Sequence, residues 1–150
     1  EDGIRDAQES RGLGDVYKRQ IKQNGGAALL IDYGDWRSKG STLQALSNHK
    51  VVSPLEFPGE VDVTAHVDFE AVYKAVPPAI SSRLTPQGLF LERLGLTQRA
   101  KVLAKKLEGK ALESHVAAHR RLSHPDEMGN LFKVIGIASQ ADHLPAGLDI

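Results

Sequence analysis

The feature that most constrains this chain is a short, continuous apolar run at residues 27–31 (AALLI). Two glycines precede the run, and Asp32-Tyr33-Gly34-Asp35 follows it. A run of this length without polar alternation is typical of a strand buried on both faces, as in a parallel sheet. A short core helix is the alternative, but the flanking glycines disfavour it. Because ligands bind at the carboxyl ends of strands in open α/β sheets, the Asp-Tyr-Gly corner is predicted to lie at a binding edge.

The segment after this corner lacks a regular pattern. Ser41 is placed to cap one short helical stretch through Leu46, and two prolines further on mark turns. Residues 35–59 are therefore predicted to form a long excursion over the sheet edge. Excursions of this length are often functional.

The rest of the chain predicts alternating helices and strands. Asp62 and Asp68 are each placed to cap a helix, the second running over residues 69–76. A first strand buried on both faces needs neighbours on each side, and this α/β order supplies few, so part of the sheet is expected to be missing. The remaining predicted elements are a strand over 79–84, a helix from Thr85-Pro86 to Gly95, a helix from Thr97, a helix over 110–122 with Leu112, Val116 and Ala117 inward, a turn from Pro125, and a strand over 131–138.

Composition narrows the classes of partner. The chain has 19 basic and 19 acidic residues, so no net charge favours nucleic acid or anionic lipid. Aromatic residues make up only 5%, which is few for stacking on nucleobases. The absence of cysteine excludes disulfides, thiolate metal sites and a cysteine nucleophile. No stretch approaches the roughly 18 consecutive apolar residues of a membrane span, so none is expected.

Residues 1–20 differ from the rest of the chain. They show neither helical nor strand periodicity, and the run at residues 11–20 (RGLGDVYKRQ) resembles a translated sequencing adaptor. We interpret residues 1–20 as a non-native or disordered tail. A native flexible tail or a severed helix is the alternative.

Five motifs carry a family resemblance when taken in their order and spacing. They are GAALLIDYG at 26–34, Ser41-Thr42-Leu43 with His49, Pro58-Gly59 leading to DVTAHVDF at 62–69, Gln87 with Phe90-Leu91 and Leu94-Gly95-Leu96, and MGNLFKVI at 128–135. Together they resemble the C-terminal half of the MidA family of S-adenosylmethionine-dependent methyltransferases. The resemblance covers residues 25–140, and TAHVDF is its most specific part.

The resemblance implies an α/β fold, namely the C-terminal part of a class I (Rossmann-like) methyltransferase sheet with inserted helices, over residues 21–150. The final strand would be the antiparallel closing strand of that sheet. The implied activity is protein-arginine N-methylation with S-adenosylmethionine in mitochondria, on a core subunit of respiratory complex I during its assembly. The competing hypotheses are a non-enzymatic assembly factor that docks through residues 35–59, and an unrelated α/β enzyme fragment.

The donor site is expected outside this chain. Class I methyltransferases hold the donor with a glycine-rich turn between a strand and a helix, where the backbone must approach the ligand closely. Gly25-Gly26 precedes the apolar run instead of following it. We therefore expect no cofactor-binding residues here, a donor-binding half encoded upstream, and a fragment that is inactive alone.

Four residues are candidates for the acceptor site. Asp32 and Tyr33 are placed to line an acceptor pocket, the carboxylate pairing with a guanidinium and the phenol shaping the pocket. Asp32 as a loop cap and Tyr33 as a packing residue are the alternatives. The resemblance also suggests His66 and Asp68 as substrate-binding residues, although Asp68 as a helix cap and His66 as a backbone-bonded histidine explain them without a site.

No metal site is predicted. His115 and His119 have the spacing of zinc ligands on a helix, but the glutamate of the HExxH arrangement is absent and two arginines follow, so a solvated face is favoured. Lys101, Lys105 and Lys106 are interpreted as a solvated face as well. A basic docking patch for a partner is the minor alternative for these lysines.

Overall fold

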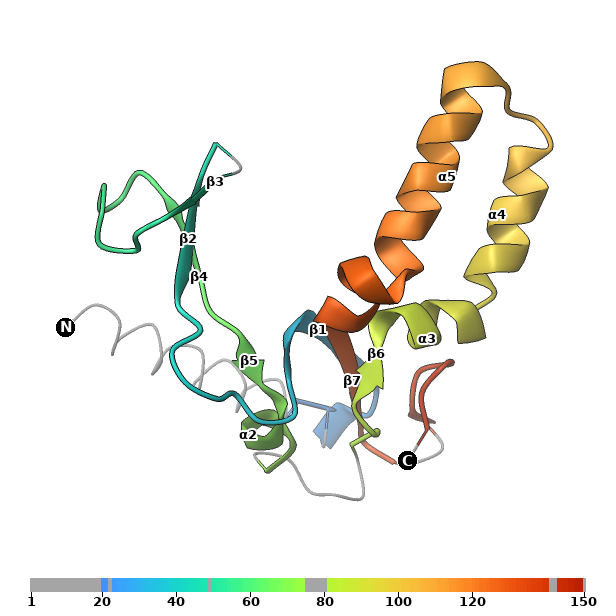
Figure 1. Ribbon diagram of the computed structural model, residues 1–150. Helices are drawn as coiled ribbons and strands as arrows, with labels where there is room; N and C mark the ends of the chain where they lie inside the picture. Colours follow the sequence, from blue (N-terminus) through green and yellow to red (C-terminus); the bar gives the residue numbers. More distant parts are fainter. Residues whose placement is uncertain (1–19, 22, 49, 75–80, 141–142, 150) are drawn as a thin grey trace.

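The computed structural model describes residues 20–21, 23–48, 50–74, 81–140 and 143–149. Its centre is an antiparallel pair of long strands, β1 (Ala27–Asp35) and β7 (Phe132–Ala138), in register from Ala27 opposite Ala138 to Tyr33 opposite Phe132. A short β5 (Val67–Asp68) runs parallel to the end of β1, and β6 (Thr85–Pro86) pairs antiparallel with β7. The sheet order is therefore β5-β1-β7-β6, and the predicted α/β class is confirmed (Figure 1).

The core lies on β7. Its residues from Val134 to Ala138 are all buried, as expected for a β-branched segment between two neighbouring strands. The C-terminal residues 143–149 pack against this strand, since a side chain at Gly136 would come within 2.6 Å of Leu148. The prediction of a closing strand over 131–138 is thereby confirmed to within one residue.

The prediction that the first strand is buried on both faces is wrong. Exposure alternates along β1, and Leu29 and Ile31 are 43% and 47% exposed. Within the described residues, β5 pairs with the second edge of β1 only opposite Gly34 and Asp35. Most of that edge and one apolar face consequently lack a partner in this part of the chain, in keeping with the expectation of a missing part of the sheet.

A second, three-stranded sheet replaces the helix that was predicted over residues 41–46. Its order is β3 (Lys50–Val52), β2 (Gln44–Ser47), β4 (Asp62–Thr64), all antiparallel, and it extends away from the main sheet (Figure 1). Asp62 lies in β4 opposite Leu46, so its predicted role as a helix cap is wrong. Pairing with β3, which follows almost at once, and with β4 further along the chain overrode the weak helical signal, because cross-strand contacts decide strand formation more than local propensity does.

Helix α2 (Phe69–Lys74) begins where the sequence predicts. The Asp68 Oδ1 atom accepts a hydrogen bond of 3.0 Å from the backbone N–H of Ala71, which confirms Asp68 as the cap. The predicted end of this helix and the start of the predicted strand over 79–84 lie outside the described residues. Of that strand, Ser81 forms an isolated bridge with Ile137, whereas residues 82–84 are not in a strand.

Four helical segments lie between β6 and β7 in the chain. The predicted helix start, with Thr85 as cap and Pro86 as first helical residue, is one residue early, because both residues pair with β7 and the helix begins at Gln87. Gly95, with a φ of 84°, ends the first helix as predicted. The segments are α3 (Gln87–Arg93), α4 (Leu96–Ala104), α5 (Gly109–Ser123) and the kinked turn η2 (Pro125–Gly129).

Helices α4 and α5 form a hairpin that projects from the sheet (Figure 1). Neither helix has a buried residue. The prediction that Val116 and Ala117 point inward is wrong, since Val116 is 56% exposed and Ala117 is also exposed, while Leu112 is half-buried. In the described part of the chain, we find no helix with the length and hydropathy that a membrane crossing requires.

A salt bridge fixes the loop after β1 to α2. The guanidinium of Arg37 donates two hydrogen bonds to Glu70, of 3.0 and 2.7 Å, and Lys74 adds an ion pair of 3.3 Å. Chiefly because of the hydrogen bond from Arg37, the pKa of Glu70 falls to about 2.

This shift predicts a pH-dependent contribution to stability. Because the carboxyl has a lower pKa when folded than when unfolded, its contribution is complete above the unfolded pKa of about 4.5 and disappears as pH falls towards about 2. Glu70→Gln should therefore lower the free energy of unfolding at pH 7, by an amount that shrinks between pH 4.5 and pH 2. Urea denaturation across this range is the measurement, with Glu60→Gln as the matched control. A difference that does not vary with pH would contradict the assignment.

Candidate functional site

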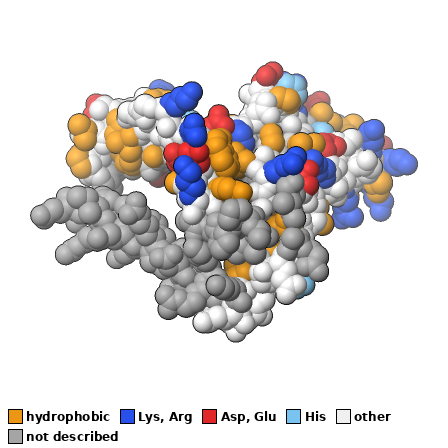
Figure 2. Space-filling view, turned by 90° about the horizontal axis from the view of Figure 1, so that it is seen from below, with side chains coloured by type: hydrophobic (Ala, Val, Ile, Leu, Met, Phe, Trp, Pro, Cys, Tyr) orange, Lys and Arg blue, Asp and Glu red, His pale blue; other side chains and the backbone are white. Residues whose placement is uncertain are grey.

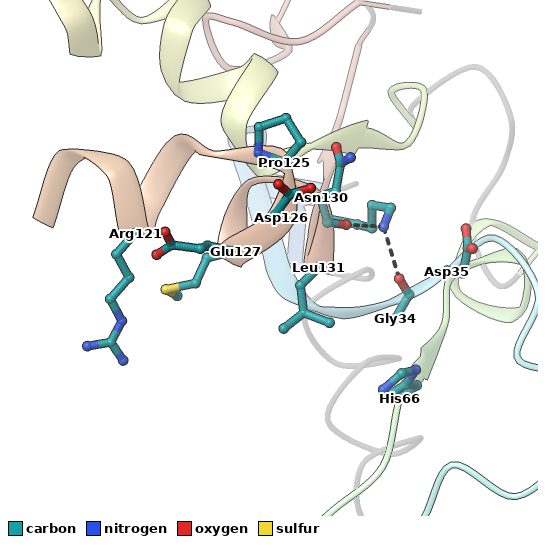
Figure 3. Close-up of a pocket in the computed structure, with 11 residues that line it drawn as sticks. Gly34, Asp35, His66, Arg121, Pro125, Asp126, Glu127, Asn130 and Leu131 are labelled. Atoms are coloured by element: carbon teal, nitrogen blue, oxygen red, sulfur yellow. Dashed lines mark hydrogen bonds between the residues drawn. The ribbon is translucent and has the colours of Figure 1, made fainter. Parts of the chain in front are cut away.

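A pocket of about 640 Å³ lies at the carboxyl end of β1, between that end and η2 (Figure 3). Its position agrees with the predicted binding edge of the sheet. One side carries the end of β1 with His66, and the other carries η2 and the start of β7. The lining residues are Gly34, Asp35, His66, Arg121, Pro125, Asp126, Glu127, Met128, Asn130, Leu131 and Lys133.

Gly34 allows the close approach of strands that builds the first side. It is buried and lies opposite Val67 in the parallel pairing of β1 with β5. A Cβ atom at this position would lie 2.2 Å from the carbonyl oxygen of Val67 and 2.9 Å from its nitrogen. Only glycine lets β5 come near enough to bring His66 to the rim of the pocket.

Lys133 joins the two sides. Its Nζ atom donates a hydrogen bond of 3.2 Å to the carbonyl oxygen of Gly34 and another to the carbonyl oxygen of Asn130 (Figure 3). Asn130 follows η2 directly, so one ammonium group connects the end of β1 to the opposite wall. This connection fixes the width of the pocket at its base.

The wall formed by η2 is held by close packing. A Cβ atom on Gly129 would lie 2.2 Å from the carbonyl oxygen of Ser123, and one on Gly88 would lie 2.4 Å from the same atom. The buried side chain of Gln87 donates a hydrogen bond of 2.9 Å to the carbonyl oxygen of Leu122. The end of α5, η2 and α3 therefore form one rigid support.

The charges that line the pocket include three carboxylates. Asp35 accepts a hydrogen bond of 2.7 Å from the backbone N–H of Trp36, and Glu127 accepts one of 2.8 Å from Arg120. The third carboxylate, Asp126, is 84% exposed at the rim. Carboxylates on both sides of a pocket can hold a planar cation, since each oxygen accepts more than one hydrogen bond.

Of the four site residues predicted from the sequence, one lies at the pocket and the others lie outside it. His66 lines the pocket, and its ring meets that of Tyr33 edge to face at 5.7 Å. Tyr33 also packs against Phe132 at 5.5 Å, and the Asp32 carboxylate accepts a hydrogen bond from the N–H of Tyr33, so neither lines the pocket. Besides capping α2, Asp68 accepts a hydrogen bond of 3.4 Å from the N–H of Ser38. The structure thus gives Asp68 two structural contacts, and the site roles of all four residues stay predictions.

The sequence reasoning missed the second side of the pocket and Asp35. Asp35 follows the Asp-Tyr-Gly corner directly, so its position at a strand end was the available signal. For Glu127 and Lys133 no local signal exists, because the antiparallel pairing of β7 with β1 brings them there. Among the residues that the structure describes, no three His, Asp or Glu side chains gather as metal ligands would. The same residues contain no glycine-rich turn between a strand and a helix, since both such junctions, before α2 and before α3, lack glycine.

Comparison with known proteins identifies the family. The model of the family described as "Putative S-adenosyl-L-methionine-dependent methyltransferase" matches residues 9–85. The chain belongs to this family. It is also 35% identical over 122 residues to protein arginine methyltransferase NDUFAF7, mitochondrial, of Xenopus laevis, and 33% identical over 122 residues to the Homo sapiens protein of that name. These matches cover 79% of the chain but only 28% and 27% of the relatives, so the chain spans little more than a quarter of their length.

Solved structures agree with this assignment. A protein from Burkholderia thailandensis superposes with a TM-score of 0.66 at 28% identity, over 90% of this chain and 37% of that one. A second structure from the same organism, bound to S-adenosyl-homocysteine, gives a TM-score of 0.62 at 30% identity, over 83% of this chain and 33% of that one. The family resemblance and the methyltransferase fold expected from the sequence are therefore confirmed.

Proposed function

We propose that residues 21–150 are the C-terminal portion of an S-adenosylmethionine-dependent protein-arginine N-methyltransferase. The observation that carries this proposal is the pocket with carboxylates on two walls at the carboxyl end of β1, in a chain of a methyltransferase family. The names of the relatives add arginine as acceptor and the mitochondrion as location. The family resemblance adds a core subunit of respiratory complex I as the protein substrate, during assembly of that complex.

The pocket suits a guanidinium acceptor. In the proposed reaction S-adenosylmethionine supplies the methyl group. Because the described strand–helix junctions lack a glycine-rich turn, the donor would be held by another part of the protein, and this part would orient the acceptor. Asp35 at the end of β1 would accept hydrogen bonds from the guanidinium and orient it. Asp32 and Tyr33 remain candidates for the same acceptor region through the contact of Tyr33 with His66, and His66 itself lines it.

The direct test uses the complete product of the coding sequence that contains this chain. Incubation with labelled S-adenosylmethionine and arginine-containing peptides is expected to give methylarginine, identified by mass spectrometry. Calorimetry on residues 1–150 alone is expected to detect no S-adenosylmethionine binding. Methylation of lysine instead of arginine would contradict the assignment of arginine as the acceptor. If the complete protein transfers no methyl group, the proposal that it is an enzyme is wrong.

Asp35 provides a sharper prediction. Asp35→Asn keeps the shape of the side chain and removes its charge, so we expect kcat/KM for the arginine substrate to fall roughly 10–100-fold. The KM for S-adenosylmethionine should not change. Asp62→Asn, an exposed carboxylate on β4 outside the pocket, is the control and should leave the rate intact. Full activity of the Asp35→Asn variant would show that Asp35 does not bind the substrate.

One observation favours the non-enzymatic alternative. The small sheet carries exposed apolar side chains, with Val51 75% exposed and Leu55 in the adjoining loop 86% exposed. Exposed apolar clusters on an extended sheet are typical of surfaces that contact a protein partner. If the complete product binds no S-adenosylmethionine, an assembly factor that docks through this sheet becomes the favoured function.

A further inference from the structure

The α4–α5 hairpin concentrates the positive charge of this chain. We define the basic arm as residues 96–123, which carry seven Lys and Arg residues against two Glu residues. The arm therefore has a net charge of +5 in a chain whose net charge is zero. Figure 2 shows several Lys and Arg side chains at the end of the molecule where the arm lies, as well as others nearer its centre. A charge asymmetry of this size on a projecting element favours an acidic partner.

An apolar groove of about 230 Å³ runs between the two helices of the arm. On α4 it is lined by Thr97, Ala100 and Ala104, whose small side chains leave the space towards α5 unfilled. On α5 Val116 faces the groove and is 56% exposed. An apolar concavity that the helices do not close by their own packing can accept the side chains of another segment.

Two histidines in the groove are already engaged. The Nε2 atom of His115 lies 3.0 Å from the carbonyl oxygen of Ala100, and that of His119 lies 3.0 Å from the hydroxyl of Thr97. The prediction that both lie on a solvated face is wrong, since they join α5 to α4. Their ring nitrogens hold the two helices together and so keep the groove in place.

Positive charge borders the groove on the α4 side. Lys101 lines it, and Lys105 follows one helical turn later on the same side. The arm has no Phe, Trp or Tyr. An amphipathic surface that binds a membrane usually presents large aliphatic or aromatic side chains on an open face. A narrow groove of alanine, threonine and histidine fits a peptide segment better than a bilayer.

We propose that the groove between α4 and α5 docks an acidic amphipathic segment of a protein partner. Its apolar side chains would enter the groove beside Ala100, Ala104 and Val116, and its carboxylates would face Lys101 and Lys105. Helix α5 leads directly into the η2 wall, so the groove and the candidate pocket are joined through the end of one helix.

The test measures binding of a labelled synthetic helical peptide to the complete product of the coding sequence that contains this chain, by fluorescence anisotropy. The peptide carries leucine on one helical face and glutamate elsewhere, and a scrambled peptide of the same composition has no apolar face. The amphipathic peptide should bind the more tightly, and Lys101→Glu with Lys105→Glu should weaken its binding roughly tenfold or more. Ala104→Leu, which fills the groove without changing charge, should weaken binding as well.

Arg99→Glu is the matched control, because Arg99 is an exposed residue of α4 that does not line the groove. It should retain binding, and circular dichroism should show the same helix content in every variant. The proposal that the groove binds the peptide would be wrong if the scrambled peptide bound equally well. It would also be wrong if Arg99→Glu weakened binding as much as the lysine variants do. Preferential binding to phosphatidylserine-containing vesicles, lost in the same lysine variants, would overturn a protein partner in favour of a membrane surface.

Discussion

Replacing Gly34 by alanine is expected to destabilise the protein by about 3 kcal/mol and to open the candidate pocket. The added Cβ atom would lie 2.2 Å from the carbonyl oxygen of Val67 and 2.9 Å from its nitrogen. Both are backbone atoms of the paired strand, so no side-chain rotation relieves the overlap. The strands β1 and β5 must separate, and His66 must move away from the pocket with them.

Urea denaturation of Gly34→Ala measures the loss of stability, and a decrease in melting temperature of roughly 6–12 °C should accompany it. Gly40→Ala is the control, since nothing lies within 4 Å of a Cβ atom there and only its φ of 72° opposes a side chain. That strain costs about 1 kcal/mol. If both variants lose the same stability, close approach at Gly34 is not what requires glycine.

Much of the main sheet could be predicted because its signals are local. The apolar run before the Asp-Tyr-Gly corner and the β-branched run near the C-terminus are both strands, and they pair with each other along their length. Asp68 could be recognised as a cap because a carboxylate before a helical run satisfies a backbone N–H that has no other partner. These features depend on residues a few positions apart.

The wrong predictions depend on how separate elements pair and pack, which no local pattern shows. Residues 44–47 have a weak helical signal, but pairing with both Val52 and Thr64 makes them a strand. The continuous run over 27–31 has the pattern of a strand buried on both faces, yet whether such a strand is covered depends on its neighbours. Within the described residues those neighbours reach only one edge fully, so Leu29 and Ile31 are exposed.

The candidate site likewise has one side that the sequence predicted and one side that it did not. The end of β1 was expected at a binding edge from strand direction alone, and Gly34 and Asp35 do line the pocket there. Glu127 and Lys133 are almost one hundred residues further along the chain, and only the tertiary fold places them opposite β1. Asp32 and Tyr33, the residues predicted from the sequence, come directly before Gly34 in β1 and do not line the pocket. The Asp32 carboxylate accepts a hydrogen bond from the N–H of Tyr33, and the Tyr33 ring packs against Phe132.

Phe69→Ala is expected to cost about 3–5 kcal/mol, because truncation of a fully buried aromatic ring removes its packing contacts and leaves a cavity. Phe69 has no exposed surface and is the largest side chain that is completely buried in the described part of the chain. It is the first residue of α2, directly after Asp68, which caps that helix and binds the N–H of Ser38. Loss of the ring should therefore also loosen the loop after β1.

The same substitution at an exposed position shows whether the loss of stability comes from the burial of Phe69 or from the loss of a phenylalanine ring as such. Phe57→Ala removes an identical ring that is 53% exposed in a loop, so it should cost less than about 1 kcal/mol. Chemical denaturation of both variants gives the comparison, and hydrogen exchange at Ser38 tests whether the loop after β1 loses protection. Equal destabilisation by the two variants would mean that Phe69 does not anchor α2, and the order of the β1 end would then depend on the Arg37–Glu70 salt bridge and the pairing with β5.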